Sequence, residues 1–119
     1  MERSFTLDEA RELMADAVEM TAAVLAVRAD LAELEADIRS GTVSPHGGLP
    51  ELKGLHARLF GALEWFGVNG IQVKGWAPLL LDFPGRRDGA AVLWCWLEGE
   101  SQVDWYHRAD CGFAGRRRV

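Results

Sequence analysis

The sequence predicts an α+β fold in one domain. A long amino-terminal helix and a second, antiparallel helix are expected to pack on a carboxy-terminal antiparallel β-meander of about four strands. Two observations carry this prediction: apolar residues recur every three or four positions up to about residue 67, and at every second position in short segments after residue 70. The 119 residues, 49% of them hydrophobic and 26% charged, are enough for one core of ordinary composition.

A long helix is expected over residues 6–40. Thr6 and Glu9 have the spacing of a capping box, and no glycine or proline follows until Gly41. The apolar positions step by three and four residues without interruption, as in a coiled-coil seam. Such a helix would be about 50 Å long, so either the second helix and the sheet cover it or it self-associates. The seam comprises Ala10, Leu13, Ala17, Met20, Val24, Val27, Leu31, Leu34 and Ile38.

A second helix is expected over residues 50–67, after the turn-forming segment "SGTVSPHGGLP". Pro50 suits the first turn of a helix, where its missing N–H is not needed. Gly67 or Gly70 can end the helix. The apolar stripe of this helix is formed by Leu52, Leu55, Leu59, Leu63 and Phe66.

The β-meander is expected over residues 70–113. Alternating segments predict strands at 71–74, 79–83, 90–97 and 102–109, with turn residues such as "PGRRDG" and "EGES" between them. Residues 114–119 then form a basic tail that contains Arg116, Arg117 and Arg118.

The last hairpin of the meander carries three of the five tryptophans and both cysteines close together. If residues 98–101 form its loop, Trp94 opposes Trp105 and Val92 opposes His107. Alternation then separates a tryptophan face from an aliphatic face that suits the helix layer. The tryptophan face carries Val92, Trp94, Trp96, Val103, Trp105 and His107, and the aliphatic face carries Leu93, Cys95, Leu97, Asp104, Tyr106 and Arg108.

The cover of the tryptophan face has three interpretations, because monomers rarely expose so large an apolar patch. Its side chains pack as core, form a dimer interface, or line a small-molecule pocket; Trp94, Trp96, Trp105 and His107 are the candidate interface or ligand residues.

The polar groups of the meander offer carboxylate and imidazole chemistry, for metal ligation or for acid–base catalysis. No recognised metal or nucleotide signature is present, so we assign no cofactor and no metal ligand. Cys95 is expected to be a small buried hydrophobe. Cys111 follows Asp110, whose negative charge raises a thiol pKa and argues against a nucleophile.

The carboxy-terminal half carries a connected set of motifs. "LLDFPGRRDG" is followed by Cys95-Trp96, by Gly99-Glu100, and by His107 five residues before "GFAGR". With the "FTLDEA" opening, the chain resembles an uncharacterised prokaryotic family, the domain of unknown function numbered 2203, over nearly its whole length. The resemblance implies a small cytoplasmic α+β protein and supplies no activity. Its polar motif positions, Asp82, Glu100, His107 and Arg116, are the candidate catalytic residues.

Charge and cysteine use limit the partners. The net charge is −5, and residues 1–50 carry ten acidic against four basic residues, which makes nucleic-acid binding unlikely. The sequence holds no uncharged apolar run near 18 residues, and its start is too acidic for a secretory signal. Two cysteines outside any CxxC motif then indicate reduced thiols in the cytoplasm.

These observations predict an interaction or scaffold module that self-associates as a homodimer, through the long helix or the tryptophan face. The alternative is a small-molecule-binding protein or metal-dependent enzyme that uses Asp82, Glu100, His107 and Arg116. Weak binding of nucleic acid or an anionic surface through residues 116–118 is the least favoured. Whether the chain is an enzyme, and which small molecule it would bind, stays open at this stage.

Overall fold

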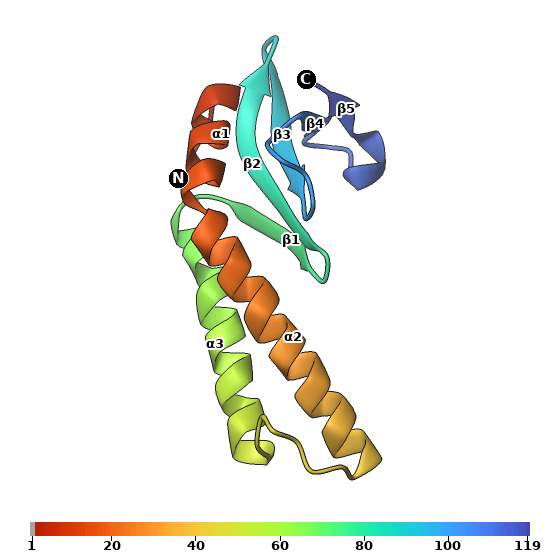
Figure 1. Ribbon diagram of the computed structural model, residues 1–119. Helices are drawn as coiled ribbons and strands as arrows, with labels where there is room; N and C mark the ends of the chain where they lie inside the picture. Colours follow the sequence, from red (N-terminus) through yellow and green to blue (C-terminus); the bar gives the residue numbers. More distant parts are fainter. Residues whose placement is uncertain (1) are drawn as a thin grey trace. The chain divides into compact units, whose positions relative to one another are not determined.

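The computed structural model describes residues 2–119 (Figure 1). It is an α+β protein whose described residues form three α-helices, a short 3-10 helix and five strands. The chain divides into two compact units, each described separately below. The sheet unit contains the residues up to Ala17 together with Phe66–Val119, and the helical unit contains Val18–Trp65.

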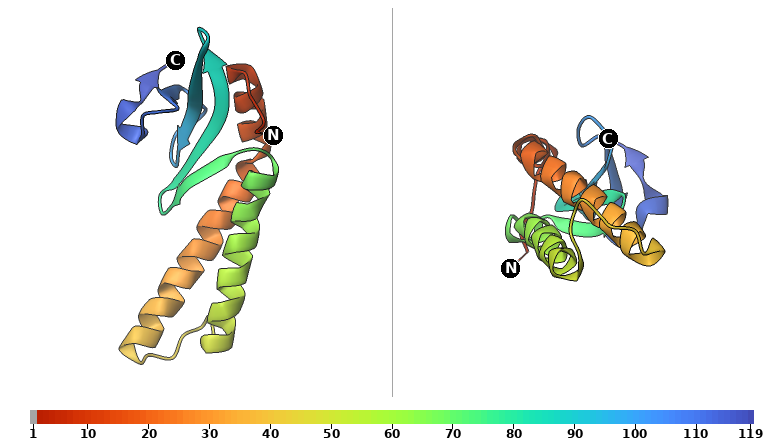
Figure 2. Two further views of the ribbon diagram at one scale, coloured as in Figure 1. Left: turned by 180° about the vertical axis from the view of Figure 1, so that it is seen from behind. Right: turned by 60° about the horizontal axis from the view of Figure 1, so that its bottom comes forward.

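The helical unit is an antiparallel hairpin of α2 (Val18–Ser40) and most of α3 (Leu49–Val68), which lie side by side (Figure 2). The second predicted helix is therefore confirmed to within one residue at each end. Pairing of the two helices buries the central part of the predicted heptad seam within one chain. The buried residues of the hairpin are Val24, Val27, Leu31 and Leu34 from the seam in α2, and Leu55 and Leu59 of α3.

The predicted helix 6–40 is wrong in its continuity. Helix α1 (Leu7–Asp16) ends before Ala17, which is fully buried and has φ −84° and ψ −1°, and α2 begins at Val18. The N–H of Ala17 is shared between the carbonyls of Leu13 and Met14, a tightened end to the helix. No glycine or proline marks the break, so local propensity does not explain it. The predicted capping box of Thr6 and Glu9 is confirmed at the start of α1.

Two glycines in α3 provide a test of helix energetics. Gly54 and Gly61 are exposed, and a Cβ atom added at either position would meet nothing within 4 Å. Gly54→Ala and Gly61→Ala are each expected to raise the free energy of unfolding by about 0.5–1 kcal/mol, because alanine loses less backbone entropy in a helix. Urea denaturation measures the change. A loss of stability in both variants would contradict the exposed, unpacked environment of these positions.

The sheet unit contains a fully antiparallel sheet with strand order β1-β2-β3-β4-β5. Strand β5 corrects the prediction of a basic tail, because Arg117 pairs with Tyr106 of β4 and the Val119 N–H donates to the Asp104 carbonyl at 3.0 Å. The strands are β1 (Gln72–Trp76), β2 (Leu79–Arg87), β3 (Ala90–Leu97), β4 (Trp105–Arg108) and β5 (Arg117–Arg118), with the 3-10 helix at Phe113–Gly115 before β5.

The predicted register of the last hairpin is wrong by one residue. Cys95 pairs with Trp105 and Leu93 pairs with His107, because the connection runs from residue 98 to 104. Arg11 of α1 holds this longer connection, donating from Nε to the Val103 carbonyl at 2.9 Å. A shift of one residue moves a strand's side chains to opposite faces. His107 and Trp105 therefore share the face of Cys95 and lie opposite Trp94 and Trp96.

On the tryptophan face, Trp94 and Trp96 are covered within the chain, by the segment around Phe5 and by α1. Trp94 Nε1 donates to the Phe5 carbonyl at 2.8 Å, and the Phe5 ring lies edge-on to Phe83 at 5.4 Å. Figure 1 shows α1 against one side of β2 and β3. Trp94 and Trp96 are only 5% and 7% exposed. Helix α1 therefore packs on the face of Trp94 and Trp96 and not, as expected, on the aliphatic face. The opposite face of the sheet carries Asp82, Cys95 and His107.

None of the described helices combines the length and the hydropathy that crossing a membrane requires.

Candidate functional site

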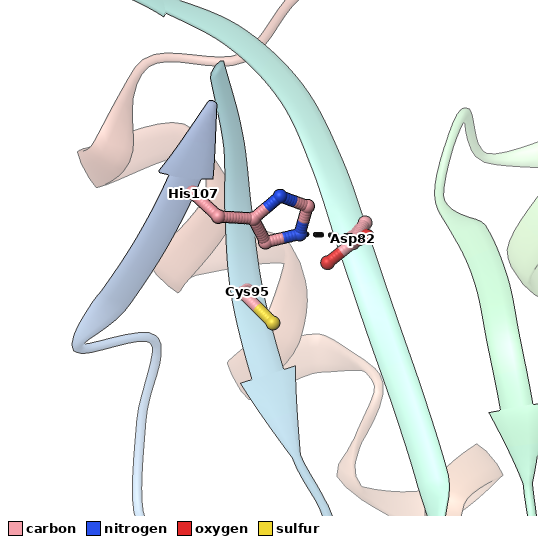
Figure 3. A group of neighbouring side chains, drawn as sticks. All are labelled: Asp82, Cys95 and His107. Carbon is pink, nitrogen blue, oxygen red and sulfur yellow. Dashed lines mark hydrogen bonds and ion pairs between the residues drawn. The ribbon is translucent and has the colours of Figure 1, made fainter. Parts of the chain in front are cut away.

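Three adjacent strands place Asp82, Cys95 and His107 side by side on one face of the sheet (Figure 3). Asp82 of β2 pairs directly with Cys95 of β3. His107 of β4 pairs with Leu93, two residues along β3, which makes it a diagonal neighbour of Cys95. The three residues are 2%, 0% and 3% exposed, so this group of an acid, a thiol and an imidazole is buried.

His107 has both ring nitrogens engaged. Nδ1 lies 2.9 Å from the Arg108 carbonyl oxygen, which can only accept, so Nδ1 carries a proton. Nε2 lies 3.1 Å from Asp82 Oδ2. Nε2 is thus engaged with a carboxylate oxygen of Asp82, the second of two contacts that fix the orientation of the ring. Neither nitrogen is then available to accept a proton from Cys95.

Asp82 has one oxygen in contacts and one without a partner. Oδ2 faces His107 and also lies 3.5 Å from Nζ of Lys74, whose side chain is 42% exposed. Oδ1 is buried, and among residues 2–119 no donor meets hydrogen-bond geometry at it, although Asp82 lies close enough to the Cys95 thiol for a side-chain hydrogen bond to help raise the thiol pKa. Leaving a buried acceptor unsatisfied costs about 1–3 kcal/mol, and more for a charged group. The fold therefore tolerates an expensive oxygen atom next to a thiol and an imidazole.

Cys95 is a protonated thiol. Burial, reinforced by the negative charge of Asp82, raises its pKa from 9.0 to about 12, although Arg116 acts in the opposite direction. The sequence-based expectation of a buried cysteine is confirmed. With no free base on His107 and a high thiol pKa, the arrangement does not suit a cysteine nucleophile, which reacts as the thiolate.

The other two candidate residues form a second pair that also contacts Cys95. Arg116 donates to Glu100 Oε1 at 2.6 Å and to the Cys95 carbonyl at 3.5 Å. Its guanidinium lies 4.9 Å from the ring centre of Trp105 and 5.0 Å from that of Phe113. Nε of Arg116 is buried and has no hydrogen-bond partner among residues 2–119.

Glu100 has a structural role in this pair. Its Oε1 accepts from the Leu97 N–H at 2.6 Å, and its carbonyl accepts from Trp96 Nε1 at 2.9 Å. The four residues selected from the sequence thus come together as two pairs, Asp82 with His107 and Glu100 with Arg116. Cys95 contacts a member of each pair.

Sequence reasoning missed Cys95 and Lys74 as parts of the site. Cys95 was set apart from His107 because the assumed hairpin loop was too short. Lys74 lies in a recognised strand segment, at an irregularity in the register between β1 and β2 that the alternating pattern does not show. The dipeptide Cys95-Trp96 within the recognised motifs was the available signal.

A second acid–imidazole group lies in the helical unit. Asp30, Glu33 and His46 offer ligand atoms within 4.8 Å of one another, and His46 Nε2 lies 2.6 Å from Glu33 Oε2. This hydrogen bond raises the pKa of His46. Glu33 is 67% exposed. Exposed clusters of this kind are hydrated ion pairs, so the group carries less weight than the buried one.

The four residues predicted to form an interface or ligand surface on the tryptophan face do not lie on one face of the sheet. Trp94 and Trp96 are in the core under α1, whereas Trp105 contacts Arg116 on the other face, beside His107. The described residues hold no single surface on which Trp94, Trp96, Trp105 and His107 meet.

Comparison with known proteins identifies a family but no activity. The family model described as "Uncharacterized conserved protein (DUF2203)" matches residues 3–119. No curated protein and no solved structure matches the chain. The match spans both units and every residue of the site, so the chain belongs to the DUF2203 family of uncharacterized conserved proteins.

Proposed function

We propose that this protein binds one divalent transition-metal ion of the zinc class through Asp82, Cys95 Sγ and His107 Nε2. One observation carries the proposal: the donor atoms of these buried residues lie within 4.8 Å of one another. Metal–ligand bonds of about 2.0–2.3 Å separate the ligands of a tetrahedral ion by roughly 3.5 Å. Small side-chain rotations bring the three donors to that spacing.

The donor set and its surroundings suit such an ion. Sulfur, imidazole nitrogen and carboxylate oxygen together favour zinc over magnesium or calcium. The hydrogen bond from His107 Nδ1 to the Arg108 carbonyl is the outer contact that commonly orients a metal-bound histidine with Nε2 inward. The unpartnered Oδ1 of Asp82 gives the carboxylate a free ligand atom.

Charge balance also supports metal binding. A divalent cation with one thiolate, one carboxylate and a neutral imidazole has no net charge. The ion and these three side chains therefore leave no net charge in the buried site, where a net charge would be costly.

The number of protein ligands suggests an enzyme rather than a structural zinc site. Catalytic zinc sites use three protein ligands and keep the fourth position for water or a substrate atom, whereas structural sites use four. Lys74 contacts Asp82 and is 42% exposed, so displacement of this flexible side chain offers a route from solvent. We therefore propose metal-dependent catalysis, in a reducing compartment such as the cytoplasm that keeps Cys95 as a thiol.

Titration with Co²⁺ tests the site. Purified metal-free protein is expected to bind one ion and to develop the near-ultraviolet thiolate-to-cobalt absorption and visible bands of a tetrahedral site. Cys95→Ser removes the thiolate band, whereas Cys111→Ser, at the other cysteine, retains it. His107→Gln weakens binding strongly, and His46→Gln does not. A thiolate band that survives Cys95→Ser, or the absence of any bound ion, contradicts the proposal.

Metal uptake is expected to release protons, because the thiol of Cys95 is protonated until an ion binds. Below the raised pKa of about 12, the thiol alone makes the metal affinity increase about tenfold for each pH unit. Calorimetry in two buffers of different ionisation enthalpy counts the protons released. A wild-type affinity that stays constant between pH 6 and 8, or binding without proton release, would exclude Cys95 as a ligand.

Reactivity of the two cysteines gives an independent check on the metal-free site. A chromogenic disulfide reagent is expected to modify Cys111, which is exposed, within the mixing time and Cys95 only as the protein unfolds. Cys111→Ser removes the fast phase and Cys95→Ser keeps it. Two fast thiols in the native protein would show that Cys95 is accessible, contrary to the buried site.

Self-association into a homodimeric scaffold is the second proposal, and it has a different basis from the sequence-based one. Leu49 and Phe60 of α3 are 63% and 57% exposed and lie 11 residues apart, about three helical turns, hence on one face. Light scattering is expected to give a dimer that Phe60→Glu dissociates, while Val43→Glu, at a position that is 94% exposed, leaves it intact. A monomeric wild-type protein at high concentration removes this proposal.

A further inference from the structure

A cavity of about 300 Å³ lies on the face of the sheet opposite the Asp82 site, near the turn between β2 and β3. Strand pairing places Ala90 and Val92 of β3 with Tyr106 and Arg108 of β4 on this face. Arg117 of β5 pairs with Tyr106 and joins them. The volume is at the lower end of the range for small-molecule sites.

Three arginines from three strands line this cavity: Arg87, Arg108 and Arg117. Arg117 is exposed, and within residues 2–119 its side chain has no hydrogen bond or ion pair. Arg87 lies over the Tyr106 ring at 4.2 Å and forms a loose ion pair, at 3.9 Å, with the exposed Asp88, which also lines the cavity. Arg108 is held by Asp110. Three arginines against one aspartate make the lining cationic, although the whole chain carries a net charge of −5.

The remaining lining adds an aromatic and apolar surface to these charges. Tyr106 and Val92 form part of the wall, and Tyr106 packs edge-on against the buried Trp94 at 6.1 Å. Tyr106 is thus fixed by the core while one side of its ring meets Arg87. Guanidinium groups bind phosphate oxygens in pairs, and an adjacent aromatic ring can contact a planar group attached to the phosphate.

We propose that this cavity binds a small organic phosphate, with Arg117 and Arg87 on the phosphate group and Tyr106 beside the organic part. The site is separate from the proposed metal centre, because Tyr106 and His107 are neighbours in β4 and point to opposite faces. Phosphate binding therefore requires no metal ion.

Phenyl phosphate and inorganic phosphate are suitable probes, titrated into metal-free full-length protein and followed by amide chemical shifts and calorimetry. Phenyl phosphate is expected to bind more tightly than inorganic phosphate, with the largest shifts in residues 87–92 and 106–117. Equal affinities for the two probes, or shifts centred elsewhere, overturn the proposal. Benzoate, with the same ring and a carboxylate, is expected to bind more weakly than phenyl phosphate, and the reverse order excludes phosphate as the preferred group.

Neighbouring arginines of β5 supply a matched pair of variants. Arg117 faces the cavity, whereas Arg118 is equally an exposed arginine but lies over Trp105, at 5.3 Å, on the other face. Arg117→Gln is expected to lower the affinity for phenyl phosphate at least tenfold, and Arg118→Gln less than twofold. Equal losses in both variants, or stronger binding to single-stranded oligonucleotide than to phenyl phosphate, would show a general attraction of the basic terminus for polyanions and would refute the cavity site.

Discussion

Gly85→Ala is expected to destabilise the protein by about 3–5 kcal/mol, a large share of the stability of a domain this size. A Cβ atom at this position would lie 2.3 Å from Trp94 Nε1 and 2.4 Å from the Phe5 carbonyl oxygen. Those two atoms form the buried hydrogen bond of 2.8 Å that joins the amino-terminal segment to the sheet. One methyl group therefore both overfills the core and separates a buried donor from its acceptor.

Urea denaturation of the Gly85→Ala protein measures this effect, with Gly112→Ala as the control. Gly112 has an extended backbone with φ −91°, and an added Cβ atom would meet nothing within 4 Å. The control is expected to stay within about 0.5 kcal/mol of the wild type. The intrinsic tryptophan fluorescence should change in Gly85→Ala, where Trp94 loses its hydrogen bond to Phe5, and should not change in Gly112→Ala. If Gly85→Ala costs less than about 1 kcal/mol, the segment around Phe5 is not docked as described.

Asp82→Ala is expected to cost about 3–5 kcal/mol in metal-free protein, because it leaves His107 buried opposite an empty position. Replacing both members of the pair, with Asp82→Leu and His107→Leu together, is expected to restore most of that stability. Apolar side chains of similar volume need no hydrogen-bond partners at a site that is 2–3% exposed. If the sheet is nearly as stable with two leucines, stability alone does not account for the polar pair.

Stabilisation by zinc distinguishes a role of Asp82 and His107 as metal ligands from a purely structural role. In the wild type, free zinc at 100 times its dissociation constant adds about 2.7 kcal/mol to the free energy of unfolding. Neither the single Asp82 variant nor the double leucine variant should gain comparable stability. A matched change at an exposed acid, Asp16→Ala at the end of α1, tests whether general charge loss matters. Equal stabilisation of wild type and double variant by zinc would place the ion elsewhere.

Local signals predicted the parts of this fold that depend on neighbours in the sequence. The capping box of Thr6 and Glu9 forms as expected, and Pro50 lies in the first turn of α3. The Asp88-Gly89 turn has positive φ at both residues, 51° and 80°, as the hairpin turn between β2 and β3 requires. Each of these features involves residues that are within a few positions of one another.

Errors arose where distant residues decide the local geometry. The hairpin register depends on Arg11, which holds the Val103 carbonyl and the Asp104 carboxylate from 92 and 93 residues away. The break at Ala17 carries no local signal. The candidate site was therefore recovered in its polar members but not in its arrangement. With the correct register, Cys95 joins Asp82 and His107, and Trp94 and Trp96 become core.

The division of the chain has a consequence for the order of folding. The sheet unit is discontinuous in sequence, since Phe5 donates to the Pro84 carbonyl at 2.7 Å while residues 18–65 form a unit of their own. Helical hairpins rich in local contacts form quickly, whereas strand pairing across long separations is slow. An early α2–α3 hairpin returns the chain toward its starting point and replaces a long flexible loop with a short one. The entropic cost of closing the loop is then lower, which favours the pairing of Phe5 with β2. Mutations that loosen the helical hairpin are therefore expected to slow the assembly of a sheet that they do not touch.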